Sequence, residues 1–418
     1  MAFSNKKKYL DFLLIGLICV PIFLHVKTVY HFALNLPRED DYDSILNIFS
    51  NYNKASFSDR IAFMFQQQGE HRALFPKLLL LFHFLIFGNI NFRHIILFDM
   101  LLLFTAFGVL VYFIKKALPD SWLIATLILS LGLFDLNNFE NADFVCAGIF
   151  NYGIVMLFLL TMFCYTHKNN KLIIPAGMLQ VMLIYSGGNG MVGALFIMLC
   201  TILQNAPKKY ITSIALFLIF TPLYFYHFNF ANPNSIFFTL DASKFLPYFF
   251  TALGANFRHD TSFFAGIAIC GVLFVLLYVF RKQWRNPATI PLVCILGFML
   301  MSLGIMAIFR GKLPLGNAYS SRYLIYSHIM LSVIFVFAFI KISVKPFLYF
   351  SAIFMLFVYY FNYQPGISGF ESFYYSMKNN EYSYPPSPEG QAHAKQIAIE
   401  ACKSGVYCIE KHRGEGFK

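Results

Sequence analysis

Four carboxylic acids lie within five consecutive positions shortly after the first apolar stretch of the chain, Tyr9–Val29. They are Glu39, Asp40, Asp41 and Asp43. The 418-residue chain is 58% hydrophobic and only 12% charged, so this cluster is unusual at the point where a membrane helix would reach water. A carboxylate held there can act as a general base that removes the proton of an attacking hydroxyl group. We expect Asp40, and after it Asp41, to have this role; the alternative is a solvated loop without chemistry.

Three cations lie in a later polar segment that reads RGKLPLGNAYSSR, and they are Arg310, Lys312 and Arg322. The topology below places them outside the membrane, where the tendency of basic residues to stay inside does not account for them. A guanidinium can form two parallel hydrogen bonds with phosphate oxygens, so Arg322, at the very start of an apolar stretch, suits an anion. An ion pair with the acidic cluster is the alternative, and the two roles are compatible.

Glu70, His71 and Arg72 directly precede another apolar stretch, Leu74–Phe87. His71 or Arg72 could stabilise the negative charge that develops on a phosphate leaving group. Alternatively these side chains anchor the chain at lipid headgroups, since Arg and His extend readily to the interface. The sequence leaves both alternatives open.

Glu140 and Asn141 follow the third apolar stretch and are candidates for a second carboxylate and its neighbour, or for an ordinary polar helix end. Asp99 falls inside a predicted span, where an ionisable residue is costly and is suspected of function by default. It could instead reach the outer interface or hydrogen-bond a neighbouring helix. No Cys and His spacing typical of a metal site occurs, although the carboxylates at 39–43 could bind an ion.

The elements that must position these residues are membrane spans. A mean hydropathy of +0.61, with 52 Phe and 25 Tyr, excludes a soluble domain and predicts an all-α polytopic membrane protein. The net charge of +12 comes mostly from Lys and Arg beside apolar stretches, which indicates topology and not nucleic-acid binding. No nucleotide-binding motif occurs, so nucleotide-driven transport is not expected. We predict about eleven transmembrane helices, at Tyr9–Val29, Phe92–Ile114, Trp122–Phe134, Cys146–Cys164, Leu172–Tyr185, Met191–Leu203, Tyr210–Tyr226, Phe263–Phe280, Thr289–Phe309, Tyr323–Ile340 and Pro346–Phe361.

Leu74–Phe87 is apolar, but it is short and contains Pro76, Lys77 and His83, so we predict an interfacial helix instead of a crossing. The N-terminus then lies inside and the polar clusters described above lie outside. With this choice every predicted inner segment is basic, as the positive-inside rule requires. These segments contain Lys6–Lys8, Lys115–Lys116, Lys168 with Lys171, Lys208–Lys209, Arg281–Arg285, and Lys341 with Lys345.

The predicted organisation is a transmembrane domain at 1–361 followed by a periplasmic tail at 362–418. The first outer loop, 32–91, carries the acidic cluster and juxtamembrane helices. Cys402 and Cys408 lie close together in the exported tail. An oxidising compartment permits a small disulfide loop there, which we expect.

These motifs resemble those of the GT-C membrane glycosyltransferases. The resemblance rests on the acidic pair after the first span, on Glu70–Lys77 leading through an apolar helix to Gly88–Arg93, and on Asn138–Asn141 at the outer end of a span. In addition, Arg310–Lys312 followed by Ser321–Tyr323 resembles a motif of bacterial members that modify O antigen, including serotype-converting glucosyltransferases.

The resemblance implies a GT-C-like bundle in the inner membrane of a bacterium, with the active site facing the periplasm. It implies transfer of a hexose, glucose above all, from a polyprenyl-phosphate donor to a lipid-linked or growing surface polysaccharide such as O antigen. Neither a cofactor nor a nucleic-acid partner is implied. The catalytic residues in that scheme are Asp40, Asp41 and Glu140. Substrate contacts would come from Glu39, Glu70, His71, Arg72, Asn141, Arg310, Lys312, Arg322 and Tyr323.

Two other classes of protein are alternatives. A flippase or other transporter of lipid-linked oligosaccharides would place charges along a pore within the spans, whereas here they gather on one face. A polysaccharide polymerase would also use outer-loop arginines, but it would not obviously need the acidic pair.

Overall fold

The computed structural model describes residues 2–229, 237–257, 259–281, 286–342, 345–379 and 387–408. The predicted inner cations Lys282 and Arg285 lie outside these ranges. The described chain is helical apart from a two-stranded antiparallel hairpin, β1 (Gln67–Gln68) with β2 (His71–Arg72). The helices are α1 (Ala2–Phe32), the π-helix η1 (Tyr42–Asn47), α2 (Ile48–Lys54), α3 (Phe57–Phe65), α4 (Leu74–Phe87), α5 (Phe92–Ala117), α6 (Trp122–Leu133), η2 (Leu136–Asn138), α7 (Phe139–Asp143), α8 (Val145–Thr166), η3 (Asn170–Leu172), α9 (Ile173–Ile184), α10 (Gly188–Leu203), α11 (Pro207–Phe225), α12 (Ala242–Leu253), α13 (His259–Phe280), α14 (Ile290–Arg310), η5 (Leu315–Tyr319), η6 (Ser321–Tyr323), α15 (Leu324–Ile342), α16 (Lys345–Asn379) and α17 (Pro388–Lys403).

Seven helices among the described residues are long and apolar enough to cross a membrane, namely α1, α5, α8, α13, α14, α15 and α16. An eighth crossing results if α6 and the segment Leu136–Asp143, bent by 42° at a short break, form one span. The chain is therefore an all-α, multi-pass membrane protein, as predicted. The count of eleven is not confirmed, because α9 and α10 comprise only 12 and 16 residues and α11 is not among the helices that are long and apolar enough.

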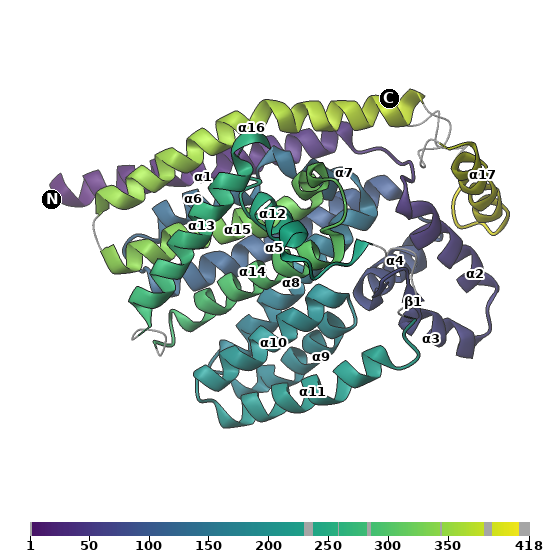
Figure 1. Cartoon of the computed structure of the whole chain (residues 1–418), viewed down its shortest axis with the longest axis horizontal. Helices are drawn as coiled ribbons and strands as arrows, with labels where there is room; N and C mark the ends of the chain where they lie inside the picture. The colour runs from purple at the N-terminus through teal and green to yellow at the C-terminus, as the bar shows by residue number, and fades with distance from the viewer. Residues whose placement is uncertain are drawn as a thin grey trace.

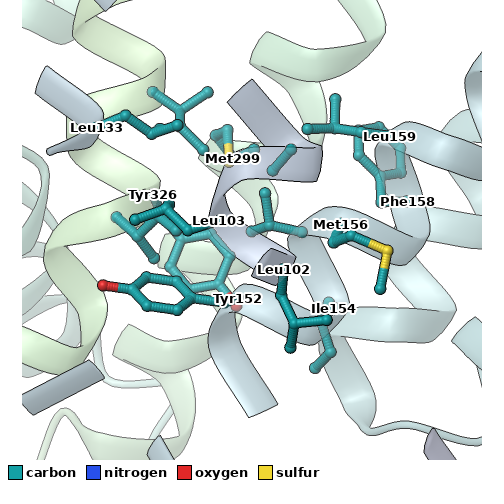
Figure 2. Close-up of a cluster of buried hydrophobic side chains, with 14 of the residues drawn as sticks. Leu102, Leu103, Leu133, Tyr152, Ile154, Met156, Phe158, Leu159, Met299 and Tyr326 are labelled. Carbon is teal, nitrogen blue, oxygen red and sulfur yellow. The ribbon is translucent and has the colours of Figure 1, made fainter. Parts of the chain in front are cut away.

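The centre of the bundle is α8, which is apolar on all sides. Such a helix is stable where neighbouring helices or lipid surround it. Other parts of the protein bury 83% of the residues in the 18-residue apolar stretch of α8. The corresponding share in α13 is only 22%, so most of the surface of α13 is available to contact lipid. Figure 2 shows side chains of α5, α8, α14 and α15 packed together, among them Leu103, Phe158, Met299 and Tyr326.

The last apolar helix extends further than predicted, because α16 continues to Asn379 and the expected domain boundary at 361 falls inside it. Its outer half packs on η2 and α7 at two glycines. A Cβ added to Gly366 would lie 2.5 Å from the backbone carbonyl carbon of Leu136, and one on Gly369 would lie 2.4 Å from the ring of Phe139. The start of the predicted tail is therefore a continuous part of the bundle.

The first outer loop forms a layer of short elements at one end of the bundle, where α17 of the tail lies beside α2 (Figure 1). The predicted disulfide is present, with Sγ atoms of Cys402 and Cys408 joined at 2.09 Å. In α4, Lys77 turns away from lipid, and its Nζ donates hydrogen bonds to the carbonyl oxygens of Phe63 at 2.9 Å and Gln66 at 2.7 Å. The opposite face of α4 is apolar and exposed, as an interfacial helix requires.

Candidate functional site

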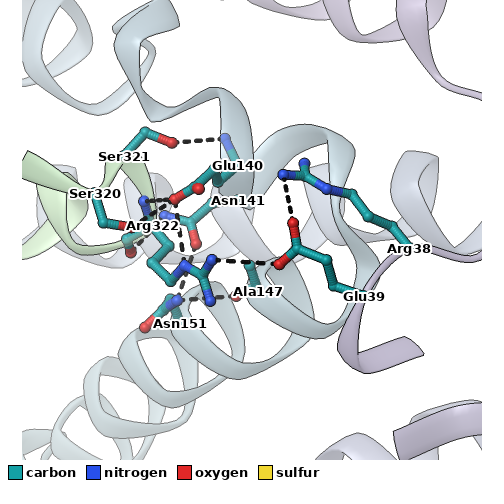
Figure 3. Close-up of polar contacts among 9 residues, drawn as sticks. All are labelled: Arg38, Glu39, Glu140, Asn141, Ala147, Asn151, Ser320, Ser321 and Arg322. Atoms are coloured by element: carbon teal, nitrogen blue, oxygen red, sulfur yellow. Dashed lines mark hydrogen bonds and ion pairs between the residues drawn. The ribbon is translucent and has the colours of Figure 1, made fainter. Parts of the chain in front are cut away.

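Three segments far apart in sequence meet at one end of the bundle (Figure 3). They are residues 38–43 after α1, residues 139–151 from α7 into α8, and residues 310–323 between α14 and α15. The acidic cluster and the outer cations therefore do face one another. The ion pair expected as the alternative role of Arg322 is present, because its Nη2 lies 4.0 Å from Glu39 Oε2.

Glu140 fixes the position of Arg322. Its Oε2 accepts hydrogen bonds from Ser320 Oγ at 2.7 Å, from the Arg322 backbone N–H at 3.0 Å and from Arg322 Nε at 3.3 Å. In turn, the backbone N–H of Glu140 donates to Ser321 Oγ at 2.8 Å. A carboxylate in the first turn of α7 is also favoured by the free N–H groups there. This arrangement favours a positioning role for Glu140 over a role as the base.

A chain of hydrogen bonds holds the backbone of Arg322 from the other side. Asn141 Nδ2 donates to the carbonyl oxygen of Arg322 at 2.8 Å, and Asn151 Nδ2 donates to Asn141 Oδ1 at 2.9 Å. The hydroxyl of Tyr326 then donates to Asn151 Oδ1 at 3.3 Å. Asn141, expected to contact substrate, thus belongs to a buried network that joins α7, α8 and α15.

Glu39 lies between Arg322 and a second arginine, Arg38, that the sequence analysis did not single out. Glu39 Oε1 accepts a hydrogen bond from Arg38 Nη2 at 3.2 Å. Arg38 is buried, and its guanidinium lies 3.3 Å from the ring centroid of Phe373 and 5.1 Å from that of Phe144, which is favourable for a cation. Glu39 has a φ of +39°, a strained conformation that persists only where the surroundings impose it. The geometry of Glu39 is therefore fixed by two arginines.

Asp41 has a structural role. Its side chain is 1% exposed, and its Oδ1 accepts a hydrogen bond from the Cys146 N–H in the first turn of α8, while Oδ2 accepts one from the Arg38 N–H, both at 3.0 Å. Burial raises the pKa of Asp41 to about 7, and these hydrogen bonds act in the opposite direction. A carboxyl group enclosed in this way caps α8, which argues against Asp41 as the base.

Asp40 differs from the two other exposed carboxylates of the cluster, because Glu39 is paired with Arg38 and Arg322, and Asp43 is paired with His393. The Asp40 side chain is exposed and forms no hydrogen bond or ion pair with any residue that the structure describes. Desolvation by the surrounding protein raises the pKa of Asp40, and the charges of Arg322 and Arg310 act in the opposite direction. A general base needs a free lone pair and access to the hydroxyl, and Asp40 has both.

Arg310 is a cation without a carboxylate partner within the described ranges; its guanidinium lies 5.6 Å from the ring centroid of Tyr323. Its charge acts on Asp40 and on His71. Burial, and after it Arg310, lowers the pKa of His71 to about 4, so this imidazole is neutral at pH 7. Arg310, Asp40 and His71 therefore form one electrostatic group, and Lys312 is exposed on the same loop as Arg310.

Arg72 is bound by the protein itself. Its guanidinium donates to the carbonyl oxygen of Tyr224 at 2.7 Å and to those of Tyr226 and Phe65. These carbonyls lie at the C-terminal ends of α11 and α3, where helices leave such groups unsatisfied. The expectation that Arg72 meets a donor phosphate is not supported, because its donors hold the hairpin against two helices. Glu70, in the turn of this hairpin, forms no ion pair within the described chain.

Asp99 is buried in α5, and its Oδ1 has no hydrogen-bond partner among the described residues. It lies against Gly148 of α8, where an added Cβ would come within 2.5 Å of Asp99 Oδ2. Glycine at position 148 therefore makes room for this carboxyl group beside the N-terminus of α8.

No family model, curated protein or solved structure matches this chain. Within the described residues, no group of three or more His, Cys, Asp or Glu side chains is arranged to hold a metal ion. The residues and geometry above are therefore the basis for assigning a function.

Proposed function

We propose that this chain is a GT-C-type membrane glycosyltransferase. It would move a hexose, glucose above all, from a polyprenyl-phosphate donor to a lipid-linked or growing surface polysaccharide such as O antigen. In this proposal the protein lies in the inner membrane of a bacterium and works at its periplasmic face. The bundle then crosses the membrane eleven times, with α9, α10 and α11 counted as crossings and α6 with α7 counted as one.

The observation that supports this proposal most is the exposed Asp40 carboxylate within the electrostatic influence of Arg310, a guanidinium that has no carboxylate partner among the described residues. Sugar transfer needs a base for the acceptor hydroxyl and a cation for the leaving phosphate, close together at a membrane surface. Asp40 and Arg310 supply these two groups. Their segments join helix ends that lie at the same end of the bundle, after α1 and after α14.

In the proposed reaction, Asp40 accepts the proton of the acceptor hydroxyl as its oxygen attacks the anomeric carbon. The bond between this carbon and the donor phosphate breaks, and the configuration at the anomeric carbon inverts. Polyprenyl phosphate leaves with its negative charge near Arg310, which stabilises the transition state. Arg322, fixed by Glu140, would help to keep Asp40 ionised at neutral pH.

The test is the structure of the surface glycan in cells with and without this chain, combined with transfer by the purified protein from polyprenyl-phosphate glucose. Loss of a side-chain sugar from otherwise unchanged polysaccharide is the expected result. Shortened chains with an intact repeat unit would point to a polymerase instead. An unaltered glycan and no transfer from any polyprenyl-phosphate hexose would overturn the proposal.

The orientation has its own test, because the site must lie outside. A cysteine introduced at Ser404 should react with a membrane-impermeant reagent added to intact cells. A cysteine introduced at Asn169 should react only after the cells are permeabilised. If both react from the same side, the proposed outer-face site is wrong.

A further inference from the structure

We propose that the disulfide-closed tail, residues 387–408, is a clasp that positions the acidic segment for catalysis, with Tyr407 as its main positioning residue. This inference rests on the proposed function for its catalytic consequence. Its structural part can be tested without any activity. The clasp consists of α17, the turn after it and the loop between Cys402 and Cys408.

The helix of the clasp lies on the elements that directly follow the acidic cluster. α17 begins at a capped end, where Ser387 Oγ accepts a hydrogen bond from the Gly390 N–H at 3.0 Å. It packs on η1 and α2 through buried residues that include Ile397 and Ala401. His393 Nε2 lies 3.0 Å from Asp43 Oδ1, but both side chains are largely exposed, so this pair contributes little to the attachment.

The turn after α17 directs the chain back onto the first outer loop. Gly405 has a φ of +74°, which glycine adopts without strain, and the Val406 N–H donates to the Ala401 carbonyl at 3.0 Å. The disulfide closes this turn across six positions. As a result Val406 and Tyr407 are both buried, although they lie near the end of a polar tail.

Val406 and Tyr407 form hydrogen bonds with both ends of the first outer loop. The hydroxyl of Tyr407 donates to the carbonyl oxygen of Asn35 at 2.7 Å, and the Ile90 N–H donates to the carbonyl oxygen of Val406 at 2.8 Å. Asn35 Oδ1 in turn accepts a hydrogen bond from the Phe92 N–H at 2.8 Å. The clasp therefore holds the start of the acidic segment against the beginning of α5.

The acidic segment needs such support because residues 33–39 are not helical and Glu39 is strained. Asn35 is five positions before Asp40, so a shift at Asn35 moves the proposed base. A misplacement of about 1 Å can lower a catalysed rate by about 10²-fold. Opening the clasp should therefore lower the turnover of bound substrate more than it weakens substrate binding.

Reduction of the disulfide between Cys402 and Cys408 should open the clasp. A small dithiol such as dithiothreitol attacks one Sγ and displaces the other. The dithiol is oxidised to its own disulfide, and Cys402 and Cys408 become two thiols that iodoacetamide can trap. Hydrogen exchange at the Ile90 and Phe92 amides, followed in the whole purified chain, then reports on the clasp. The control helix is α8, whose amides should not change.

We expect reduction, and also the double variant Cys402→Ser with Cys408→Ser, to speed exchange at these two amides at least tenfold. Transfer should fall roughly tenfold to a hundredfold, in kcat more than in KM. Cys270→Ser, which changes a thiol within α13, should have neither effect. Tyr407→Phe keeps the ring and should show a smaller change of the same kind, whereas Tyr375→Phe, on an exposed part of α16, should show none.

Three results separate this inference from the proposed function. Complete reduction with unchanged exchange at Ile90 and Phe92 would overturn the clasp, whatever the activity. Faster exchange with an unchanged kcat would overturn its positioning role. Faster exchange in a protein that transfers no sugar at all would leave the clasp standing and would overturn the glycosyltransferase proposal instead.

Discussion

The two outer arginines should differ in what their loss does to the protein. We consider Arg310→Gln and Arg322→Gln, which remove the charge and keep an amide of similar length. Arg322 has two carboxylate partners, Glu140 and Glu39, whereas Arg310 has none among the described residues. The sequence alone ranked Arg322 above Arg310 as the phosphate ligand. For the proposed phosphate contact we now expect the opposite order, because a guanidinium already held by two carboxylates is a weaker phosphate ligand than an unpaired one.

The expected sizes follow from the contacts. Arg322→Gln removes the 3.3 Å hydrogen bond to Glu140, and a hydrogen bond to a charged group contributes about 1.5–3 kcal/mol. The Arg322 side chain is only 24% exposed, so we expect the free energy of unfolding to fall by about 2–3 kcal/mol. Arg310→Gln removes a contact with the ring of Tyr323 at 5.6 Å, worth about 0.5–1 kcal/mol. The transfer rate of Arg310→Gln per folded molecule should fall about 10²–10³-fold, because the variant lacks the cation that would stabilise the leaving phosphate.

The assay combines unfolding in detergent micelles with transfer from a purified polyprenyl-phosphate sugar, normalised to folded protein. Arg281→Gln is the matched control, because Arg281 also lies over a ring, that of Tyr278 at 4.3 Å, but at the predicted inner end. Arg281→Gln should lower the free energy of unfolding by a similar amount, about 0.5–1 kcal/mol, and should leave the transfer rate unchanged. The reasoning would be refuted if Arg310→Gln transferred sugar normally while Arg322→Gln lost transfer at full stability. Arg322 would then be assigned as the phosphate ligand.

Three further changes test the other residues. Asp40→Asn should lower transfer about 10²–10⁴-fold at unchanged protein level, and near-normal glycan modification in cells would exclude Asp40 as the base. The folded protein holds the Asp41 proton up to about pH 7, because burial raises the pKa of this group, whereas the unfolded chain releases the proton near pH 4. The free energy of unfolding should therefore fall as the pH rises between these two values. Asp41→Asn should make that slope shallower without removing it, because other buried carboxyl groups such as Asp99 and Asp135 also contribute. An unchanged slope would exclude Asp41. Gly366→Ala places a Cβ 2.5 Å from the backbone of Leu136 and should lower the free energy of unfolding by about 1–3 kcal/mol. Gly304→Ala is the control, because a Cβ at position 304 would lie in open space. Equal melting curves for the two variants would contradict the packing described.

The class of fold could be predicted because apolar length and flanking charge leave few alternatives. The positions of the long spans followed from hydropathy, and the disulfide followed from two nearby cysteines in a tail that was predicted to be exported. The length of α16 could not be predicted in the same way. Pro365, Gly366 and Gly369 normally indicate the end of a helix, whereas here the glycines give room for η2 and α7.

The site was predictable where charge itself carried the signal. The meeting of the acidic cluster with Arg310 and Arg322 followed from their common location on one face. Which carboxylate is buried could not be predicted, because Asp40 and Asp41 are adjacent and only the position of α8 distinguishes them. Arg38 was missed because its partner Phe373 is more than 300 residues away. Hydroxyls beside Arg322, such as Ser320, could have been recognised as partners from their position in the motif.

The length of α16 also bears on how far from the lipid chains the proposed reaction would take place. Twenty-eight steps along the helix lead from Lys345 to Phe373, which is about 42 Å at about 1.5 Å per residue. The hydrocarbon core of a bilayer is about 30 Å thick. If α16 runs along the membrane normal with Lys345 at the inner boundary, Phe373 and the guanidinium of Arg38 above its ring would lie about 12 Å beyond the hydrocarbon, among the lipid headgroups. A lipid-borne phosphate resides at that depth, so the proposed polyprenyl-phosphate donor would reach Arg310 by lateral diffusion, with its polyprenyl chain still in the bilayer.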